Sequence, residues 1–120
     1  SNLERNEWAI SLLNLQPSDR VLEIGFGPGV TIQKMSEIVT DGVIWGIDRS
    51  EVMFRQASKR NQRAISAGRV RLVLTSVSQL PSFDNPFDKI LAVNNFQFWD
   101  NKTEVLKRLR EQLRTGGIIA

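Results

Sequence analysis

The sequence predicts an α/β fold, a doubly wound parallel sheet with helices on both faces. Three observations lead to this prediction. Short apolar runs of strand character alternate along the chain with segments in which apolar residues recur at helical spacing. Turn-forming residues separate these segments, and neither an internal repeat nor an interdomain linker interrupts them. Strands that alternate with helices form parallel βαβ units, so we expect a single domain over residues 1–120.

Five segments are predicted in the first part of the chain. They are a helix over 4–14, a strand over 20–24, a helix over 29–39, a strand over 42–48 and a long helix from Ser50 to Gly68. Trp8, Leu12 and Leu15 share one stripe of the first helix, with Ile10 and Leu13 nearby, which is the spacing of an amphipathic helix. The run 20–24 is typical of a strand that is covered on both faces.

The rest of the chain continues the alternation. A strand over 69–74, a loop over 75–86, a strand over 87–93 and a helix over 103–113 follow in this order. Gly116 and Gly117 are expected to close that helix, and only one or two residues of a fifth strand come after them. We therefore expect the C-terminal part of the sheet to be missing, and its open end to support a homodimer.

Composition argues against several classes of protein. Hydrophobic residues make up 41% and charged residues 24%, as in a globular domain, and no apolar stretch is long enough to span a bilayer. The absence of cysteine and histidine removes disulfides, thiolate sites and the commonest metal ligand, so we expect no metal and a cytoplasmic location. The net charge of +3 is small. Arg55, Lys59 and Arg63 recur every four residues, but such a row is more often a solvated helix face than a nucleic-acid site.

The segment VLEIGFGPG, residues 21–29, carries the main functional signal. Gly25, Gly27 and Gly29 follow the first predicted strand, where glycine permits unusual backbone angles and lets a ligand approach the main chain. The helix that follows offers unpaired N–H groups at its start. Asp48 ends the second predicted strand at the same edge of the sheet. A carboxylate there can accept hydrogen bonds from both hydroxyls of a ribose.

The spacing of the glycines argues against a dinucleotide cofactor. A dinucleotide fingerprint reads G-x-G-x-x-G and opens its domain, whereas this segment reads E-x-G-x-G-x-G and follows a predicted helix. Pro28 also removes an N–H group that a pyrophosphate would use. A nicotinamide-dependent oxidoreductase domain is therefore the less favoured alternative.

Four segments of the chain match motifs of one known family. VLEIGFGPG matches its first motif, IDRSEVM its second-strand acid, FDKILAVNNFQFW its fourth-strand segment, and LKRLREQLRTGG the helix and double glycine before its fifth strand. Together they resemble the class I S-adenosylmethionine-dependent methyltransferases of the small-molecule type. The resemblance implies a Rossmann-like sheet of usually seven strands, S-adenosylmethionine as cofactor and a small-molecule methyl acceptor. It leaves open whether the 120-residue chain is itself active.

The resemblance implies a role for each residue that matches a motif. Glu23 would hold the glycine loop and favour the cofactor's ammonium group, Asp48 would bind the ribose, and the backbone carbonyl of Asn94 would face the ammonium. The methionine part of the cofactor would be wrapped by main-chain atoms of Gly25, Phe26, Gly27 and Gly29. The adenine would lie beside Arg49, Met53, Ser76 and Val77.

The acceptor and any catalytic base stay open at this point. In-line displacement at a sulfonium methyl depends on positioning and exclusion of water, and a base is needed only for a protonated acceptor. The chain lacks histidine, cysteine and tyrosine, and the sequence places no carboxylate convincingly for this role. Phe96, Phe98 and Trp99 either line an acceptor pocket or belong to the core. Nucleic acid is unlikely as the acceptor because the Asn-Pro-Pro-aromatic signature is absent. A non-catalytic module that binds the cofactor or its demethylated product is the other alternative.

Overall fold

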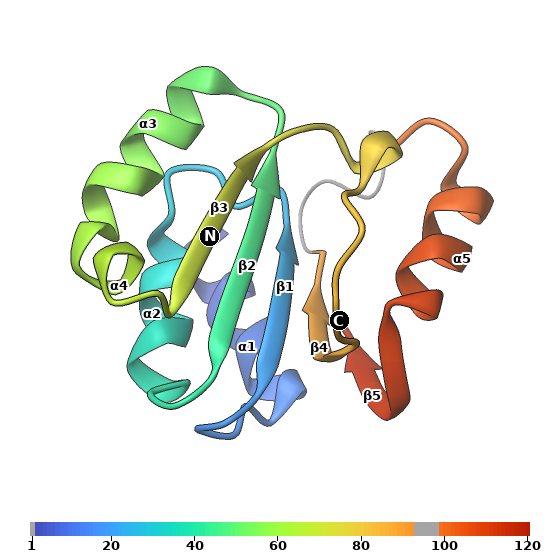
Figure 1. Cartoon of the computed structure of the whole chain (residues 1–120), viewed down its shortest axis with the longest axis horizontal. Helices are drawn as coiled ribbons and strands as arrows, with labels where there is room; N and C mark the ends of the chain where they lie inside the picture. Colours follow the sequence, from blue (N-terminus) through green and yellow to red (C-terminus); the bar gives the residue numbers. More distant parts are fainter. Residues whose placement is uncertain (1, 93–98) are drawn as a thin grey trace.

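The computed structural model of the chain describes residues 2–92 and 99–120. These residues form a five-stranded parallel sheet with helices on both faces, which confirms the predicted fold class (Figure 1). The helices are α1 (Asn2–Leu13), α2 (Val30–Ile38), α3 (Glu51–Arg60), α4 (Gln62–Ser66), the short 3₁₀ helix η1 (Val77–Gln79) and α5 (Lys102–Glu111). The strands are β1 (Arg20–Ile24), β2 (Val43–Asp48), β3 (Val70–Leu74), β4 (Phe87–Leu91) and β5 (Leu113–Ile119).

The strand order places β1 at the centre of the sheet. The order is β3-β2-β1-β4-β5, and every neighbouring pair is parallel. The chain runs from β1 outward to β2 and β3, and then returns to the other side of β1, where β4 pairs with it. The strand order therefore reverses between β1 and β4. In doubly wound sheets, ligands bind beyond the carboxyl ends of the strands at this point.

Two hydrophobic clusters hold the layers together. Val21 of β1 and Ile44 of β2 belong to the cluster that α1, α2, α3 and α4 complete. Leu22 and Ile47, which point the other way, belong to the cluster that α5 completes. Figure 1 shows α2, α3 and α4 on one side of the sheet and α5 on the other. Successive strand residues point to opposite faces, so both faces of β1 are buried as predicted.

The buried face of α1 differs from the predicted stripe. Trp8 and Leu12 are 63% and 47% exposed, so this part of the stripe faces away from the core. Ile10 and Leu13, which lie beside the stripe, are buried with Ala9 in the first cluster, and Leu15 packs against it. Both sets of residues have helical spacing, and periodicity alone does not decide which of two apolar stripes meets the sheet.

The long helix predicted from Ser50 to Gly68 is two helices. Ser50 caps α3 as expected, because its hydroxyl accepts a backbone N–H at 3.2 Å. The chain breaks at Asn61, whose buried side-chain amide donates to the carbonyl oxygens of Ala57 at 3.0 Å and Gly29 at 3.1 Å. An asparagine that bonds to the main chain competes with the helix. The side chain of Asn61 therefore links the end of α3 to the residue that precedes α2.

The end of the chain also departs from the prediction. Gly116 and Gly117 do not close α5; they lie within β5, a strand of seven residues rather than one or two. The register of β5 against β4 shifts between Phe87 and Lys89, and Gly116 has a positive φ of 82° near this shift. Glycine at positive φ is common both at helix ends and in β-bulges, so the sequence signal was ambiguous.

The remaining differences are small. The segment predicted as a loop over 75–86 contains η1, and α1 ends at Leu13, where Asn14 follows with a φ of 48°. Of the strand predicted over 87–93, β4 includes the residues up to Leu91, and residue 93 lies outside the described part of the chain.

Candidate functional site

The glycine loop after β1 is shaped by left-handed backbone. Gly25, Gly27 and Gly29 have φ values of 76°, 55° and 87°, a region in which side chains are strained. A Cβ on Gly29 would lie 2.7 Å from the Cβ of Ala57 on α3, so this glycine permits close packing of the loop on the helix. A Cβ on Gly27 would meet nothing within 4 Å. The loop is therefore tight on one side and open on the other.

Asp48, at the end of β2, ties this loop to the neighbouring elements. One carboxylate oxygen accepts the N–H of Gly27 at 2.8 Å, and the other accepts the N–H of Ser50 at 2.9 Å. The backbone carbonyl of Asp48 accepts the N–H of Thr75 at 2.9 Å. Each carboxylate oxygen has two lone pairs, so both can accept a further hydrogen bond from a ligand.

Glu23, on β1, is a buried carboxylate with an unsatisfied oxygen. Its exposed fraction is 6%, and no described residue donates a hydrogen bond to Oε1. Burial, and secondly the nearby charge of Asp48, raise the pKa of Glu23 to about 8. A buried acceptor without a partner costs about 1–3 kcal/mol. A ligand that brings a cation or a hydrogen-bond donor to this point would relieve the cost.

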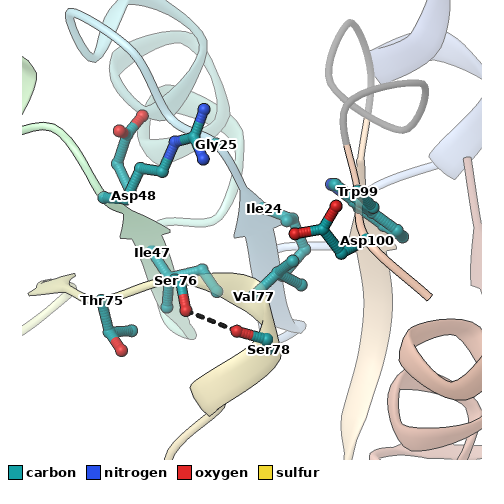
Figure 2. Close-up of a pocket in the computed structure, with 11 residues that line it drawn as sticks. Ile24, Gly25, Ile47, Asp48, Thr75, Ser76, Val77, Ser78, Trp99 and Asp100 are labelled. Atoms are coloured by element: carbon teal, nitrogen blue, oxygen red, sulfur yellow. Dashed lines mark hydrogen bonds between the residues drawn. The ribbon is translucent and has the colours of Figure 1, made fainter. Parts of the chain in front are cut away.

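A pocket of about 200 Å³ opens where β1, β2 and β3 end. Figure 2 shows Asp48 on one side of it and Trp99 with Asp100 on the other, with Ile24 and Val77 between them. The hydroxyls of Ser76 and Ser78 are hydrogen-bonded to each other at 2.8 Å along its lower edge. The lining residues are Ile24, Gly25, Ile47, Asp48, Arg49, Thr75, Ser76, Val77, Ser78, Trp99 and Asp100.

The structure brings most of the expected residues to this edge of the sheet. The expected residues that line the pocket are Gly25, Asp48, Arg49, Ser76 and Val77. The expected residues that lie in the loop, strand or helix beside it without lining it are Glu23, Phe26, Gly27, Gly29 and Met53.

Three expectations in this region need comment. The side chain of Phe26 is 3% exposed and packs in the core, so only its main chain is available to a ligand. Asn94, like Phe96 and Phe98, lies outside the described residues. Trp99 packs in the second hydrophobic cluster, which confirms the core alternative, and it also borders the pocket at the strand ends.

Sequence reasoning missed several residues of the pocket. Ile24 is the last residue of β1, and Ile47 is the last apolar residue of β2. Both could have been expected at the pocket, because the sequence predicted where these strands end. Thr75 and Ser78 flank the predicted pair Ser76 and Val77. Asp100 had no such signal, since only the fold of the chain after β4 brings its carboxylate to the pocket.

Two kinds of site have no support in the described part of the chain. Residues 2–92 and 99–120 contain no group of three or more His, Cys, Asp or Glu side chains that could hold a metal ion. The helices within the same ranges are too short or too polar to cross a membrane.

A doubly wound sheet with a left-handed glycine loop after β1 and an acid at the end of β2 defines an α/β domain of the nucleotide-cofactor class. Residues 21–117 match the model of a family described as a methyltransferase domain, and the chain belongs to this family. This membership decides against the nicotinamide-dependent alternative.

Several curated relatives are named methyltransferases, and two of them show how much longer these proteins are than this chain. An uncharacterized methyltransferase, YdaC of Bacillus subtilis, is 34% identical over 97% of the chain and 62% of its own length. The 27-O-demethylrifamycin SV methyltransferase of Amycolatopsis mediterranei is 29% identical over 91% of the chain and 40% of its own length. The chain thus spans about half the length of these two relatives.

Solved structures agree in fold. A crystal structure of a methyltransferase from Thiobacillus denitrificans, described as S-adenosylmethionine-dependent and in complex with S-adenosylhomocysteine, is 26% identical with a TM-score of 0.78. The match covers 97% of this chain and 46% of that one. The YcgJ protein of Bacillus subtilis has a TM-score of 0.83 at 23% identity, covers 97% of this chain and 48% of its own, and shows the fold alone.

Proposed function

We propose that this chain is the S-adenosylmethionine-binding domain of a methyltransferase that acts on a small molecule. The observation that carries the proposal is the glycine loop, open at Gly27 and clamped by Asp48 beside a pocket at the strand ends. The names of the relatives support it, since one acts on a rifamycin precursor and a solved neighbour holds S-adenosylhomocysteine.

The residues present suit each part of this cofactor. The unsatisfied Oε1 of Glu23 would receive the ammonium group of the methionine part, and the charge of the ammonium would in turn favour the ionised carboxylate against its raised pKa. The free lone pairs of Asp48 would accept the ribose hydroxyls. Ser76, Val77 and Arg49 would border the adenine. The pocket, at about 200 Å³, is smaller than a typical ligand site of about 300–1,000 Å³, so the rest of the cofactor would lie along the open loop.

The protein's share of the chemistry is positioning. The cofactor supplies a methyl group on a sulfonium, a leaving group that needs no protonation. Ile24, Val77 and Trp99 would exclude water from one side of the pocket. Asp100, which faces the pocket from the side opposite Asp48, is the described carboxylate best placed to take a proton from an acceptor or to bind its donor group.

Calorimetric titration with S-adenosylmethionine, S-adenosylhomocysteine and NAD tests the proposal. We expect saturable binding of the first two, weakened at least about tenfold in Asp48→Ala, because the variant loses both the ribose acceptors and the clamp on Gly27. Asp84→Ala, which changes an exposed aspartate before β4, is the matched control and should bind as the unchanged protein does.

Two results of this titration would contradict the proposal. Binding of NAD alone would overturn the cofactor assignment. Equal weakening in the Asp48 and Asp84 variants would remove the role of Asp48. If the cofactor binds but no methyl transfer occurs in an acceptor screen, the chain is the non-catalytic binding module instead.

We also propose that two copies of the chain associate through β5. This strand is an edge of the described sheet, and Ile118 on it is 36% exposed. Unpaired N–H and C=O groups along an edge strand are a template for pairing with another chain. Sedimentation at micromolar concentration should show a dimer that Ile118→Lys dissociates and that Val52→Lys, an equivalent change on exposed α3, leaves intact. A monomer at this concentration would contradict the proposal.

A cytoplasmic location completes the proposal. The absence of cysteine from the sequence supports it, because disulfides are the common device of small domains exported to oxidising compartments. Fractionation of cells that express the protein, with the protein detected by antibody, tests the location.

A further inference from the structure

A second hollow lies on the flank of the molecule formed by α2, α3, α4 and the start of β3. It has a volume of about 600 Å³ and shares no residue with the pocket at the strand ends. In Figure 1 these three helices lie on the side of the sheet away from α5. The hollow, called the basic hollow below, is lined by Gln33, Ser36, Glu37, Lys59, Arg60, Asn61, Gln62, Arg63, Ala64 and Arg69.

The charge of the basic hollow is unbalanced. Four cationic side chains line it, together with a single carboxylate, that of Glu37. None of the four cations forms an ion pair with any residue that the structure describes. Like charges gathered in a concave surface raise the local positive potential and attract anions. The four are Lys59, Arg60, Arg63 and Arg69.

Two of the guanidinium groups are held in place without being neutralised. Arg60 donates through Nη1 to the carbonyl oxygen of Pro28 at 2.7 Å, and Arg69 donates through Nη1 to that of Ser36 at 3.1 Å. A backbone carbonyl oxygen holds the guanidinium in place, but because the carbonyl carries no net charge it does not neutralise the positive charge of the arginine. Each guanidinium has five N–H donors, so most remain available to a ligand.

The break between α3 and α4 gathers the cations. Asn61, 3% exposed, bonds to the carbonyls of Ala57 and Gly29 and so fixes the corner at which α3 ends. The corner brings Lys59 from α3 and Arg63 from α4 to one hollow with the start of β3. Cations that are oriented before binding lose less conformational entropy when a ligand arrives.

We propose that the basic hollow binds a small phosphate-bearing anion with at least two negative charges. Arg60 and Arg69 bring planar guanidinium donors, the kind that pairs with phosphate oxygens, to the two ends of α2, and Lys59 and Arg63 add charge from α3 and α4. The alternative, an extended nucleic-acid backbone, would use the row along α3. That row is interrupted, because Arg55 is paired with Glu51 and does not line the hollow.

Calorimetric titration of the full chain with inorganic pyrophosphate at low salt tests this proposal without any cofactor, so its outcome is independent of the proposed function. We expect saturable binding at one site, tighter than for inorganic phosphate. Lys59→Gln and Arg63→Gln should each weaken it at least fivefold, because both side chains are exposed and their loss removes charge and not packing. Circular dichroism should show that both variants are folded.

Arg55→Gln is the matched control, since it removes an exposed cation from the same helix but outside the hollow. It should bind pyrophosphate within twofold of the unchanged protein. The absence of saturable binding, or an equal loss in Arg55→Gln, would overturn the proposal. Binding of a single-stranded oligonucleotide that tightens with its length and depends on Arg55 would overturn it in favour of nucleic acid.

Discussion

The two sides of β1 are built by different means. On the β2 side, glycines let neighbouring residues pack directly on the main chain: a Cβ on Gly46 would lie 2.9 Å from the ring of Phe26, and one on Gly29 would lie 2.7 Å from the Cβ of Ala57. On the β4 side, large side chains such as Phe87 fill the space between sheet and α5. Packing on a glycine main chain leaves no room for a Cβ at that position, whereas contacts between large side chains can be exchanged for others of similar volume. We therefore expect the β2 side to tolerate fewer substitutions than the β4 side.

The sharpest test of this comparison is Gly29→Ala, for which we expect the largest effect. The new Cβ would overlap the backbone and side chain of Ala57 at 2.7–2.8 Å, in a left-handed conformation. We expect a loss of roughly 3–5 kcal/mol in the free energy of unfolding, measured by urea denaturation.

The matched control for Gly29→Ala is Gly27→Ala, which has a positive φ of 55° but open space around its Cβ. Its cost should be about 1–2 kcal/mol, from backbone strain alone. Equal losses in the two variants would show that close packing of the loop on α3 does not distinguish these positions.

Glu23→Gln should change how stability depends on pH. The folded-state pKa of about 8 lies above the ordinary value of 4.5, so the folded protein binds a proton more tightly than the unfolded chain. The contribution of Glu23 to stability is therefore fully present below pH 4.5 and is lost, by a few kcal/mol, as the pH rises to about 8. The variant, which has no charge to bury, should lose this slope in urea denaturation between pH 5 and 9.

The same variant separates stability from binding. At pH 9, Glu23→Gln should be more stable than the unchanged protein, yet bind S-adenosylhomocysteine about tenfold more weakly because the ammonium loses its anionic partner. Glu104→Gln, on an exposed position of α5, should alter neither property. If the free energy of unfolding of Glu23→Gln and of the unchanged protein varied with pH in the same way, the pKa of Glu23 would not be raised by folding, and the prediction would be wrong.

Asp100→Asn should have the smallest effect of the three. Its side chain is exposed and lies across the pocket from Asp48. We expect a change below about 0.5 kcal/mol in stability and an unchanged affinity for S-adenosylhomocysteine, with a lower kcat/KM for any acceptor found by screening. A loss of cofactor affinity as large as that of Asp48→Ala would show that Asp100 contributes to cofactor binding as much as Asp48 does, which would contradict the prediction.

The features of the fold that could be predicted from the sequence are those that depend on local contacts. The strand–glycine–helix unit after β1, the cap at Ser50 and the acid at Asp48 are signalled by local chemistry, because each depends on residues close in sequence. The break at Asn61 was missed because its partner, Gly29, is 32 residues away. Whether a residue stays in a helix or leaves it for such a distant contact is decided by tertiary structure.

The candidate site was predictable to a similar extent. Its glycines and Asp48 form a spaced motif, whereas Asp100 belongs to no motif and is recognised only because it lines the pocket. Gly116 and Gly117 of β5 were mistaken for a helix end because glycine is common both at helix ends and in β-bulges. The structure was also needed to show that Glu23 is buried with one oxygen lacking a hydrogen-bond donor, because a sequence does not show which buried acid lacks a donor.

The central place of β1 has a consequence for synthesis on the ribosome. One edge of β1 pairs with β2, which follows it closely, but the other waits for β4: the N–H of Arg20 bonds to Asp88, 68 residues later. At about 5–20 residues per second, this edge stays open for roughly 3–14 seconds while the chain elongates. The nascent protein therefore presents an apolar strand edge to its surroundings, and chaperones that shield such edges should raise its folding yield.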